Sequence, residues 1–354
     1  MQVVLLHFVT AFLPQTAERA GPMRVVFDGH MAVYVFFLIS GAVLTPSFAR
    51  GTGVVRQAGK RLVRLGIPVV AASVFALALL AAMPDAHRDA AAVTGSGWLA
   101  MDSSGAPSLE HLLHEIAFDS LLLGYREYSL FAPFADRLPL LETSLNAPFW
   151  SLHLELYGSL LVLGLTRLRG RSAWLHRAAV ALCAVLFGAH PMFLFVIGHL
   201  CARWPGRPVV GAALIGLGLA MSGSGNWHIV DAIRVVAGHA TLGDVPNLFQ
   251  FQRQLAAVAL FAGVLSSAFA HRWLSGTVCL GLGRLSFGIY LVHFPILFTL
   301  ACVMIGPLAG VLPYPAAAGL TFLGFMAVTL LAAAAFERWI DRGAIRAARR
   351  IGTR

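Results

Sequence analysis

The sequence has little charge for its size. Only 12% of its 354 residues are charged, while 58% are hydrophobic. Soluble domains carry about 25% charged residues. So few charges cannot cover a water-facing surface of this size, which excludes a soluble globular domain. We therefore predict an all-α fold: a polytopic bundle of membrane helices that uses the lipid bilayer as part of its solvent.

Cysteine is also scarce, and two sequence motifs are missing. The four cysteines lie in or beside apolar runs, with no CxxC pair and no spacing typical of metal ligands. We expect them to be buried apolar side chains, and we predict no metal site and no permanently bound cofactor. A Gly-x-Ser-x-Gly motif is absent, so nothing indicates a serine acyl-enzyme. The chain also shows no internal repeat.

The net charge of +10 does not indicate nucleic-acid binding. The basic residues occur in short clusters between long apolar runs, rather than in a stripe that alternates with exposed aromatic residues. We therefore predict no nucleic-acid partner.

Long apolar segments dominate what the sequence does contain. The first of them is shorter than the roughly 20 residues that a membrane span requires. It has no basic residues before it, so it is not a signal peptide, and we expect further residues upstream of Met1. About ten transmembrane helices are predicted, at residues 1–13, 31–48, 65–83, 149–166, 174–189, 191–202, 208–222, 254–270, 285–304 and 315–335.

The connections between these segments alternate in charge. One set carries 19 of the 26 basic residues, and the other carries 7 basic residues and 13 of the 16 acids. Because basic connections stay in the cytosol, we predict that both termini are cytosolic and that 336–354 is a basic cytosolic tail. Residues 84–148 are then a non-cytosolic region, either an acceptor-binding loop or a solvated connection. Residues 1–354 read as a single membrane domain of the inner (cytoplasmic) membrane.

Glu155 is the one acid inside a predicted helix. An ionisable group at membrane depth costs several kcal/mol unless it faces a cavity or a partner, which makes it a functional candidate. Ser151 lies four residues earlier on the same helical face, and Trp150 and His153 lie on an adjacent face. The alternative is a polar cluster that joins helices.

Two further features have an ordinary interpretation as well as a functional one. His7 is the only polar side chain between Val3 and Phe8, and such a residue is often interfacial. Lys60, Arg61 and Arg64 precede an apolar segment and can present guanidinium groups to phosphate oxygens. The same cluster also fits a cytosolic loop without any binding role.

Five stretches of the sequence resemble the acyltransferase-3 family of integral membrane O-acyltransferases, bacterial enzymes that modify lipopolysaccharide and other glycans. They are the run around His7, the stretch 29–41 that ends in Ser40-Gly41, the Arg-x-x-Arg pattern at 61–64, the Trp-Ser-Leu-x-x-Glu block at 150–155, and the block 283–295. They occur in the family's order and span nearly the whole chain.

This resemblance implies transfer of an acyl group, with acetyl expected, from cytosolic acyl-CoA to a hydroxyl of a carbohydrate or glycan acceptor. His7 would be the general base, because neutral imidazole suits that task near pH 7. Glu155 would orient a histidine, as the third member of a triad does. The other expected roles are phosphate binding by Lys60, Arg61 and Arg64, support by Ser151 and His153, oxyanion donation by Tyr290 and Trp150, and an acceptor side near His30 and His293.

Two other functions remain open at this stage. A secondary transporter typically has inverted repeats and broken helices, and uptake without acyl product would favour it. An inactive scaffold of the same fold would show no thioester turnover.

Overall fold

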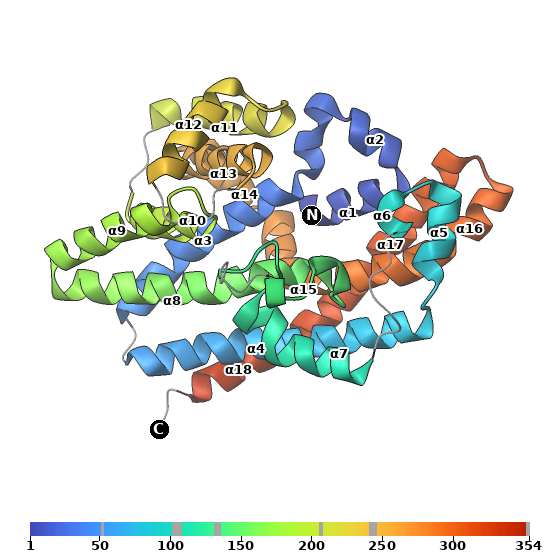
Figure 1. Ribbon diagram of the computed structural model, residues 1–354, viewed down its shortest axis with the longest axis horizontal. Coiled ribbons are helices and arrows are strands. Elements are labelled where there is room, and N and C mark those ends of the chain that lie inside the picture. Colours follow the sequence, from blue (N-terminus) through green and yellow to red (C-terminus); the bar gives the residue numbers. More distant parts are fainter. Residues whose placement is uncertain (51–52, 101–107, 131–135, 205–207, 241–245, 352–354) are drawn as a thin grey trace. The chain divides into compact units, whose positions relative to one another are not determined.

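The structure is a computed structural model that describes residues 1–50, 53–100, 108–130, 136–204, 208–240 and 246–351. Across these ranges every regular element is a helix, as predicted (Figure 1). Parts of the predicted 84–148 loop, of the basic connection 203–207 and of the C-terminal tail lie outside the described residues.

Within the described residues, six helices are long and apolar enough to cross a membrane. A bent pair of helices adds a seventh candidate if it forms one span, and three further apolar helices have only 10–17 residues. Each of the ten predicted segments coincides with one of these elements, while the number of spans and the side of the termini stay predictions. The six candidates are Gly29–Arg50, Val54–Ala82, Ala147–Arg171, Leu248–Ser266, Thr277–Val311 and Tyr314–Arg350.

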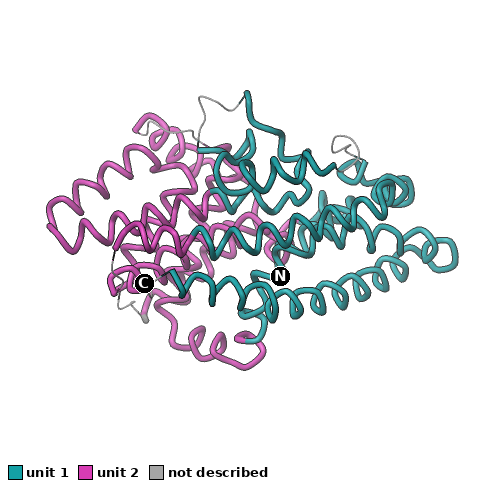
Figure 2. Tube along the Cα trace, turned by 90° about the horizontal axis from the view of Figure 1, so that it is seen from below, with its two compact units in different colours: residues 1–20, 62–153, 281–354 teal, residues 21–61, 154–280 magenta. Residues whose placement is uncertain are grey.

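The chain folds into two compact units, each assembled from separate stretches of sequence (Figure 2). Unit 1 comprises Met1–Ala20, Leu62–His153 and Gly281–Arg354, and unit 2 comprises Gly21–Arg61 and Leu154–Leu280. Three long helices contribute residues to both units, namely α4 (Val54–Ala82), α8 (Trp150–Arg171) and α15 (Thr277–Ile296).

Unit 1 holds the first helix, the predicted non-cytosolic region and the C-terminal helices. The predicted helix 108–123 is present in this unit as two consecutive elements, α7 and the π-helix η2. The bounds of these two and of the other elements of unit 1 are as follows. The elements are α1 (Gln2–Phe12), α2 (Pro14–Arg19), α5 (Ala86–Thr94), α6 (Gly97–Ala100), α7 (Leu109–His114), η2 (Glu115–Leu123), η4 (Leu141–Thr143), η5 (Ala147–Phe149), η6 (Leu297–Ala301), α16 (Cys302–Val311), α17 (Tyr314–Phe336), η7 (Glu337–Asp341) and α18 (Arg342–Arg350).

Local backbone chemistry places α6 against α1. Gly95 ends α5 with φ of +69°, a left-handed conformation that glycine adopts without steric cost. The next residue, Ser96, donates a hydrogen bond of 3.0 Å to the carbonyl oxygen of Thr10 on α1. The turn therefore brings Trp98, the second residue of α6, to the first helix.

Unit 2 is a set of closely packed apolar helices. Its remaining elements are η1 (Gly21–Phe27), α3 (Gly29–Arg50), α9 (Ala173–Phe187), α10 (Met192–Cys201), α11 (Pro208–Gly223), α12 (His228–Ala240), α13 (Leu248–Ser266) and α14 (Ala268–Leu274).

Glycine allows α3 and α10 to pack at close range. A Cβ atom at Gly41 would overlap the carbonyl oxygen of Phe195, and one at Gly198 would overlap that of Leu38. Small residues at helix contacts are typical of membrane proteins, in which van der Waals packing rather than the hydrophobic effect holds helices together.

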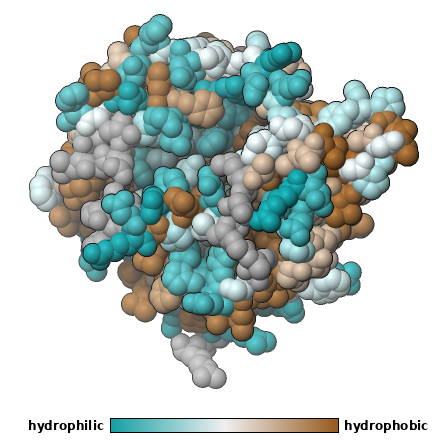
Figure 3. Space-filling model, turned by 45° about the vertical axis from the view of Figure 1, so that its right-hand side comes forward, coloured by the Kyte–Doolittle hydropathy of each residue, from teal (hydrophilic) through white to brown (hydrophobic). Residues whose placement is uncertain are grey.

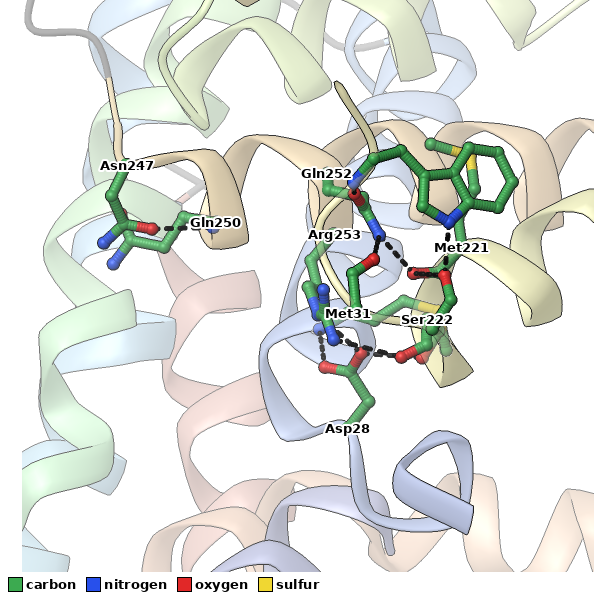
Figure 4. Close-up of polar contacts among 11 residues, drawn as sticks. Asp28, Met31, Met221, Ser222, Asn247, Gln250, Gln252 and Arg253 are labelled. Carbon is green, nitrogen blue, oxygen red and sulfur yellow. Dashed lines mark hydrogen bonds and ion pairs between the residues drawn. The ribbon is translucent and has the colours of Figure 1, made fainter. Parts of the chain in front are cut away.

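A break between α11 and α12 is held by side chains from α13. The two helices are bent by 92° at this break. Gln252 donates to the carbonyl oxygens of Met221 and Gly225 and accepts from the Trp227 amide, at 2.8–3.0 Å (Figure 4). The backbone groups that the break exposes are thus satisfied inside the protein, which a membrane segment requires.

Large apolar side chains are exposed along the long helices. Figure 3 shows hydrophobic residues on the surface beside hydrophilic ones. On α17, Leu323 and Leu331 expose 64% and 73% of their surface. Such residues would be unfavourable in water, and lipid explains them.

Candidate active site

His7 pairs with a second histidine from the other end of the chain. His7 lies on α1 and His293 near the end of α15, and both belong to unit 1. His7 Nδ1 is 2.9 Å from His293 Nε2, and the rings stack with centroids 5.1 Å apart. His293 is fully buried and His7 half-buried. The sequence assigns the two residues to different sides of the reaction, whereas the structure brings them together.

The contacts of His293 determine which nitrogen of His7 carries the proton. His293 Nδ1 is 2.9 Å from the carbonyl oxygen of Ile289. A carbonyl oxygen only accepts, so Nδ1 is protonated, and in a neutral imidazole Nε2 is then an acceptor. His7 Nδ1 must donate to this acceptor, so the proton of a neutral His7 ring is on Nδ1. The contact with His293 therefore fixes the tautomer of His7.

A pocket of about 110 Å³ lies next to the two aromatic rings that contact His7. Trp98 stacks on His7 with ring centroids 5.6 Å apart, and Phe294 contacts it edge-on at 5.4 Å. Both aromatic residues also line the pocket. The rest of the lining is Leu80, Leu141, Glu142, Ser144, Leu145, Ala147 and Phe298.

Buried polar side chains hold the pocket wall formed by residues 141–147. The Asn146 side chain donates a hydrogen bond of 2.7 Å to a backbone carbonyl of α15. The Leu145 amide donates to Glu115 Oε2 at 2.9 Å. Asn146 and Glu115 are both fully buried. The wall is therefore fixed by the fold rather than formed by a loose loop.

Glu155 lies in unit 2, where it forms an ion pair. Arg61 donates to Glu155 Oε1, and Ser40 Oγ donates to the same oxygen at 3.2 Å. The side chains of Arg61 and Glu155 are only 12% and 4% exposed. The sequence predicts that Glu155 orients a histidine; in the structure these contacts are to an arginine and a serine, and the partner of His7 is His293.

The predicted phosphate-binding residues share helix α4 but differ in surroundings. Arg61 turns inward to its carboxylate, while Arg64 is exposed and Lys60 half-buried. Lys60 and Arg64 are therefore the members of the cluster that present positive charge to the surroundings.

Ser151 and Tyr290 contact each other rather than the ion pair. The Ser151 and Tyr290 hydroxyl oxygens are 2.7 Å apart, and Tyr290 donates to the carbonyl oxygen of Pro148 at 2.6 Å. Tyr290 lies about one turn before His293 on α15, with ring centroids 6.1 Å apart. The two hydroxyls thus anchor the start of α8 beside the histidine pair.

His153 and Trp150 contact the predicted non-cytosolic region. His153 is fully buried and accepts from the Leu130 amide at 3.2 Å. Trp150 packs on Tyr128 with ring centroids 4.4 Å apart. Both positions belong to unit 1.

A family model described as an acyltransferase domain matches residues 1–336. The chain belongs to the acyltransferase-3 family. Neither a curated protein nor a solved structure matches the chain. The family and the apolar helices together make this acyltransferase-3 protein a multi-pass membrane protein with acyltransferase activity in general.

This acyltransferase-3 protein has a second buried ion pair, which was not predicted from its sequence. Asp28 caps α3 through the Met31 amide and accepts from Arg253 Nε at 3.2 Å and Ser222 Oγ at 2.6 Å (Figure 4). Arg253, which the predicted boundaries place in a connection, lies inside α13 and is fully buried. Arg253 directly precedes the predicted apolar segment 254–270, and this position could have indicated that it lies inside the helix.

His30 lies beside this second pair, in unit 2. Its ring meets Phe249 edge-on with centroids 5.7 Å apart, and the Arg253 guanidinium lies 3.9 Å above the same ring. His30 and His293, both predicted near the acceptor, thus belong to different units.

Glu115 is a buried carboxyl without an arginine partner, unlike Glu155 and Asp28. It is 0% exposed, and burial raises its pKa to about 7 despite the stabilising hydrogen bond from Leu145. His111 lies 3.9 Å away, and its own pKa is lowered by burial. Glu115 is therefore poised to change its charge near neutral pH.

Proposed function

We propose that the protein is a membrane-embedded O-acyltransferase that moves an acyl group from cytosolic acyl-CoA to a hydroxyl of a carbohydrate or glycan acceptor. The observation that carries the proposal is the His7–His293 pair beside a pocket, in a chain that belongs to an acyltransferase family. Such a pair supplies what an alcohol nucleophile lacks, a positioned base.

The reaction begins when His7 Nε2 takes the proton of the acceptor hydroxyl. The oxygen attacks the thioester carbonyl, and the resulting imidazolium keeps its Nδ1–H bond to neutral His293 Nε2. A hydrogen bond from a charged donor is about twice as strong as a neutral one, so His293 stabilises the charge that develops on His7. Collapse of the intermediate forms the ester, breaks the carbon–sulfur bond and returns the proton to the thiolate.

The donor's phosphates would be bound by the cationic cluster on α4. Lys60 and Arg64 present their charges to the surroundings, whereas Arg61 is engaged by Glu155. In this proposal the first two bind phosphate oxygens, and the ion pair keeps their helix in place. Coenzyme A is a cytosolic molecule, so the proposal puts this end of α4 at the cytosolic face of the inner membrane.

Transport is the alternative that the bent pair α11–α12 favours, since transporters bind ions at helix breaks. At this break, however, the carbonyl oxygens of Met221 and Ser222 accept hydrogen bonds from Gln252 and Arg253. The protein's own side chains occupy groups that an ion would need. Uptake into liposomes without acyl product would favour transport.

The test measures free thiol release by purified protein in lipid nanodiscs, with acyl-CoA donors and an acceptor panel of methyl glycosides and lipopolysaccharide. His7→Ala should lower kcat by about 10²–10⁴, the usual contribution of a positioned base. His239→Ala, which removes an exposed histidine of α12, is the matched control and should turn over normally. Equal rates for both variants would contradict the assignment of His7.

His293 is a positioning residue, and its test separates that role from packing. His293→Leu should lower kcat about tenfold or more and shift the pH profile of kcat/KM, because the tautomer of His7 is no longer set. His293→Gln retains an acceptor and should restore part of the rate. A uniform loss in both variants with an unchanged pH profile would indicate packing only.

A further inference from the structure

The pocket beside His7 lies where part of the acyl donor must sit. A general base works within about 3 Å of the proton it removes, so the thioester carbonyl is close to His7 Nε2 during attack. The walls of the pocket include Trp98 and Phe294, the same rings that contact His7. The pocket is therefore one aromatic ring away from His7, within reach of a chain attached to the reacting carbonyl.

The lining of the pocket is almost entirely apolar. Seven of its nine residues are Leu, Ala, Phe or Trp. Of the two polar ones, Ser144 Oγ is already bonded to the Tyr125 hydroxyl at 3.0 Å and the Asn146 amide at 3.0 Å. Glu142 is exposed. A sugar ring needs several hydrogen-bond partners when buried, whereas a hydrocarbon chain needs none.

The size of the pocket exceeds what acetyl can use. A water-sized group needs about 10–15 Å³ of such volume, so 110 Å³ accommodates several carbon atoms. An acetyl donor carries one carbon beyond the carbonyl and would leave most of the apolar wall uncovered. Each additional buried methylene contributes about 0.8 kcal/mol, which gives longer chains an advantage.

We propose that this pocket is the acyl-chain subsite and that the protein prefers a donor chain of about four to eight carbons to acetyl. The inference rests on the proposed function, since it names the donor of that same reaction. The acceptor oxygen forms the new C–O bond, the C–S bond breaks, and the acceptor proton passes through His7 to the departing thiolate. The chain in the pocket is a spectator that holds the carbonyl at the base.

The first experiment measures binding, so it does not depend on turnover. Thioether analogues of acyl-CoA that carry methyl, hexyl or hexadecyl groups are titrated into the full-length protein in nanodiscs by calorimetry. The hexyl analogue should bind at least tenfold more tightly than the methyl analogue. Ala147→Leu fills the pocket and should abolish this gain. Ala92→Leu, the same change at an exposed site of α5, should keep it.

The second experiment repeats the series as turnover with acetyl-, hexanoyl- and palmitoyl-CoA. Wild-type kcat/KM should peak at hexanoyl-CoA, at least about 10-fold above acetyl- and palmitoyl-CoA, since even one methylene in an apolar pocket can change kcat/KM by about 10- to 200-fold. Leu141→Ala enlarges the pocket and should move the peak to longer chains. This variant keeps the proposal testable if Ala147→Leu fails to fold.

Each outcome separates this inference from the proposed function. Equal binding of the methyl and hexyl analogues, or an acetyl preference that Ala147→Leu leaves unchanged, overturns the inference while acyl transfer stands. If the pocket variants change only the KM for the glycan acceptor, the pocket belongs to the acceptor, which also overturns the inference. Chain-length-dependent binding with no turnover of any donor supports the subsite and contradicts the transferase function.

Discussion

Units 1 and 2 both bury ionisable groups, but they treat charge differently. Unit 2 pairs Glu155 with Arg61 and Asp28 with Arg253 in two buried ion pairs. Unit 1 buries Glu115 beside a histidine at 3.9 Å and without an arginine. His293 of the same unit is buried and bonds to His7. Unit 2 thus gives arginine partners to two buried carboxylates, whereas Glu115 of unit 1 has none. Each unit also holds a histidine pair, His7–His293 in unit 1 and His176–His199 in unit 2.

The difference follows from what each kind of pair can do. A buried ion pair is costly to break, because loss of one partner leaves an uncompensated charge in a medium of low dielectric constant. A pair of neutral imidazoles passes from neutral to singly charged by gaining one proton, and the charge is shared across a hydrogen bond. Proton transfer therefore favours a histidine pair, and a rigid frame benefits from buried ion pairs.

The largest effect should come from breaking the Arg61–Glu155 pair. Arg61→Ala removes the arginine partner of the buried Glu155 carboxylate and should reduce the free energy of unfolding by about 3–5 kcal/mol. Adding Glu155→Gln removes the stranded charge and should recover most of that loss. Thermal unfolding of the purified variants in detergent measures both changes.

Arg64→Ala is the matched control for that comparison, because Arg64 is an exposed arginine of the same helix. It should change the unfolding free energy by about 0.5 kcal/mol or less. Equal destabilisation by the two arginine variants would show that unit 2 does not depend on its ion pair.

Glu115, the carboxyl that unit 1 buries without an arginine, should make the stability depend on pH. The pKa of Glu115 is raised from 4.5 to about 7 in the folded protein, so its stabilising contribution is complete below pH 4.5 and is lost as the pH rises through 7. Between pH 5 and 8 the wild type should lose about 2.5 kcal/mol more than Glu115→Gln. Unfolding midpoints across this pH range measure the difference.

Two titratable neighbours of Glu115, His111 and Asp119, remain present in both proteins. Burial lowers the pKa of His111 and raises that of Asp119, so their contributions to the pH dependence have opposite signs. A wild type whose midpoint follows pH in parallel with Glu115→Gln would mean that the buried carboxyl stays ionised.

The smallest effect sharpens the description of unit 2. The Arg253 guanidinium lies 3.9 Å above the Phe249 ring, and Phe249→Leu should cost about 0.5–2 kcal/mol, the range for a desolvated cation–π contact. Phe251→Leu, on the same helix, removes a ring of equal size from a buried position and controls for lost packing. If the second variant costs as much as the first, the cation contributes nothing measurable.

Much of the fold could be predicted, because hydropathy is a local property. All ten apolar segments appear as helices, and the helix predicted at 108–123 is present. Boundaries were less accurate: α13 begins six residues before the predicted 254–270 segment, so Arg253 was placed outside it. The number of spans rests on helix lengths, and three of the ten segments are short.

The residues of the candidate site could be predicted from the sequence, but not which of them contact each other. Glu155 and His7 stand out as polar residues within apolar segments, which are expensive in a membrane, whereas Arg61 and His293 were predicted with the help of the family resemblance. No sequence signal marks Trp98 as a wall of the pocket, since its place depends on the turn at Gly95.

The sequence by itself determined that this chain is helical, lives in a membrane and buries a few ionisable side chains, because composition and periodicity express these properties residue by residue. Only the tertiary structure decided that His7 meets His293 across 286 positions and Arg61 meets Glu155 across 94. The reason is physical: a local pattern sets the free energy of placing a residue in lipid, but a hydrogen bond forms only where two helices deliver both partners.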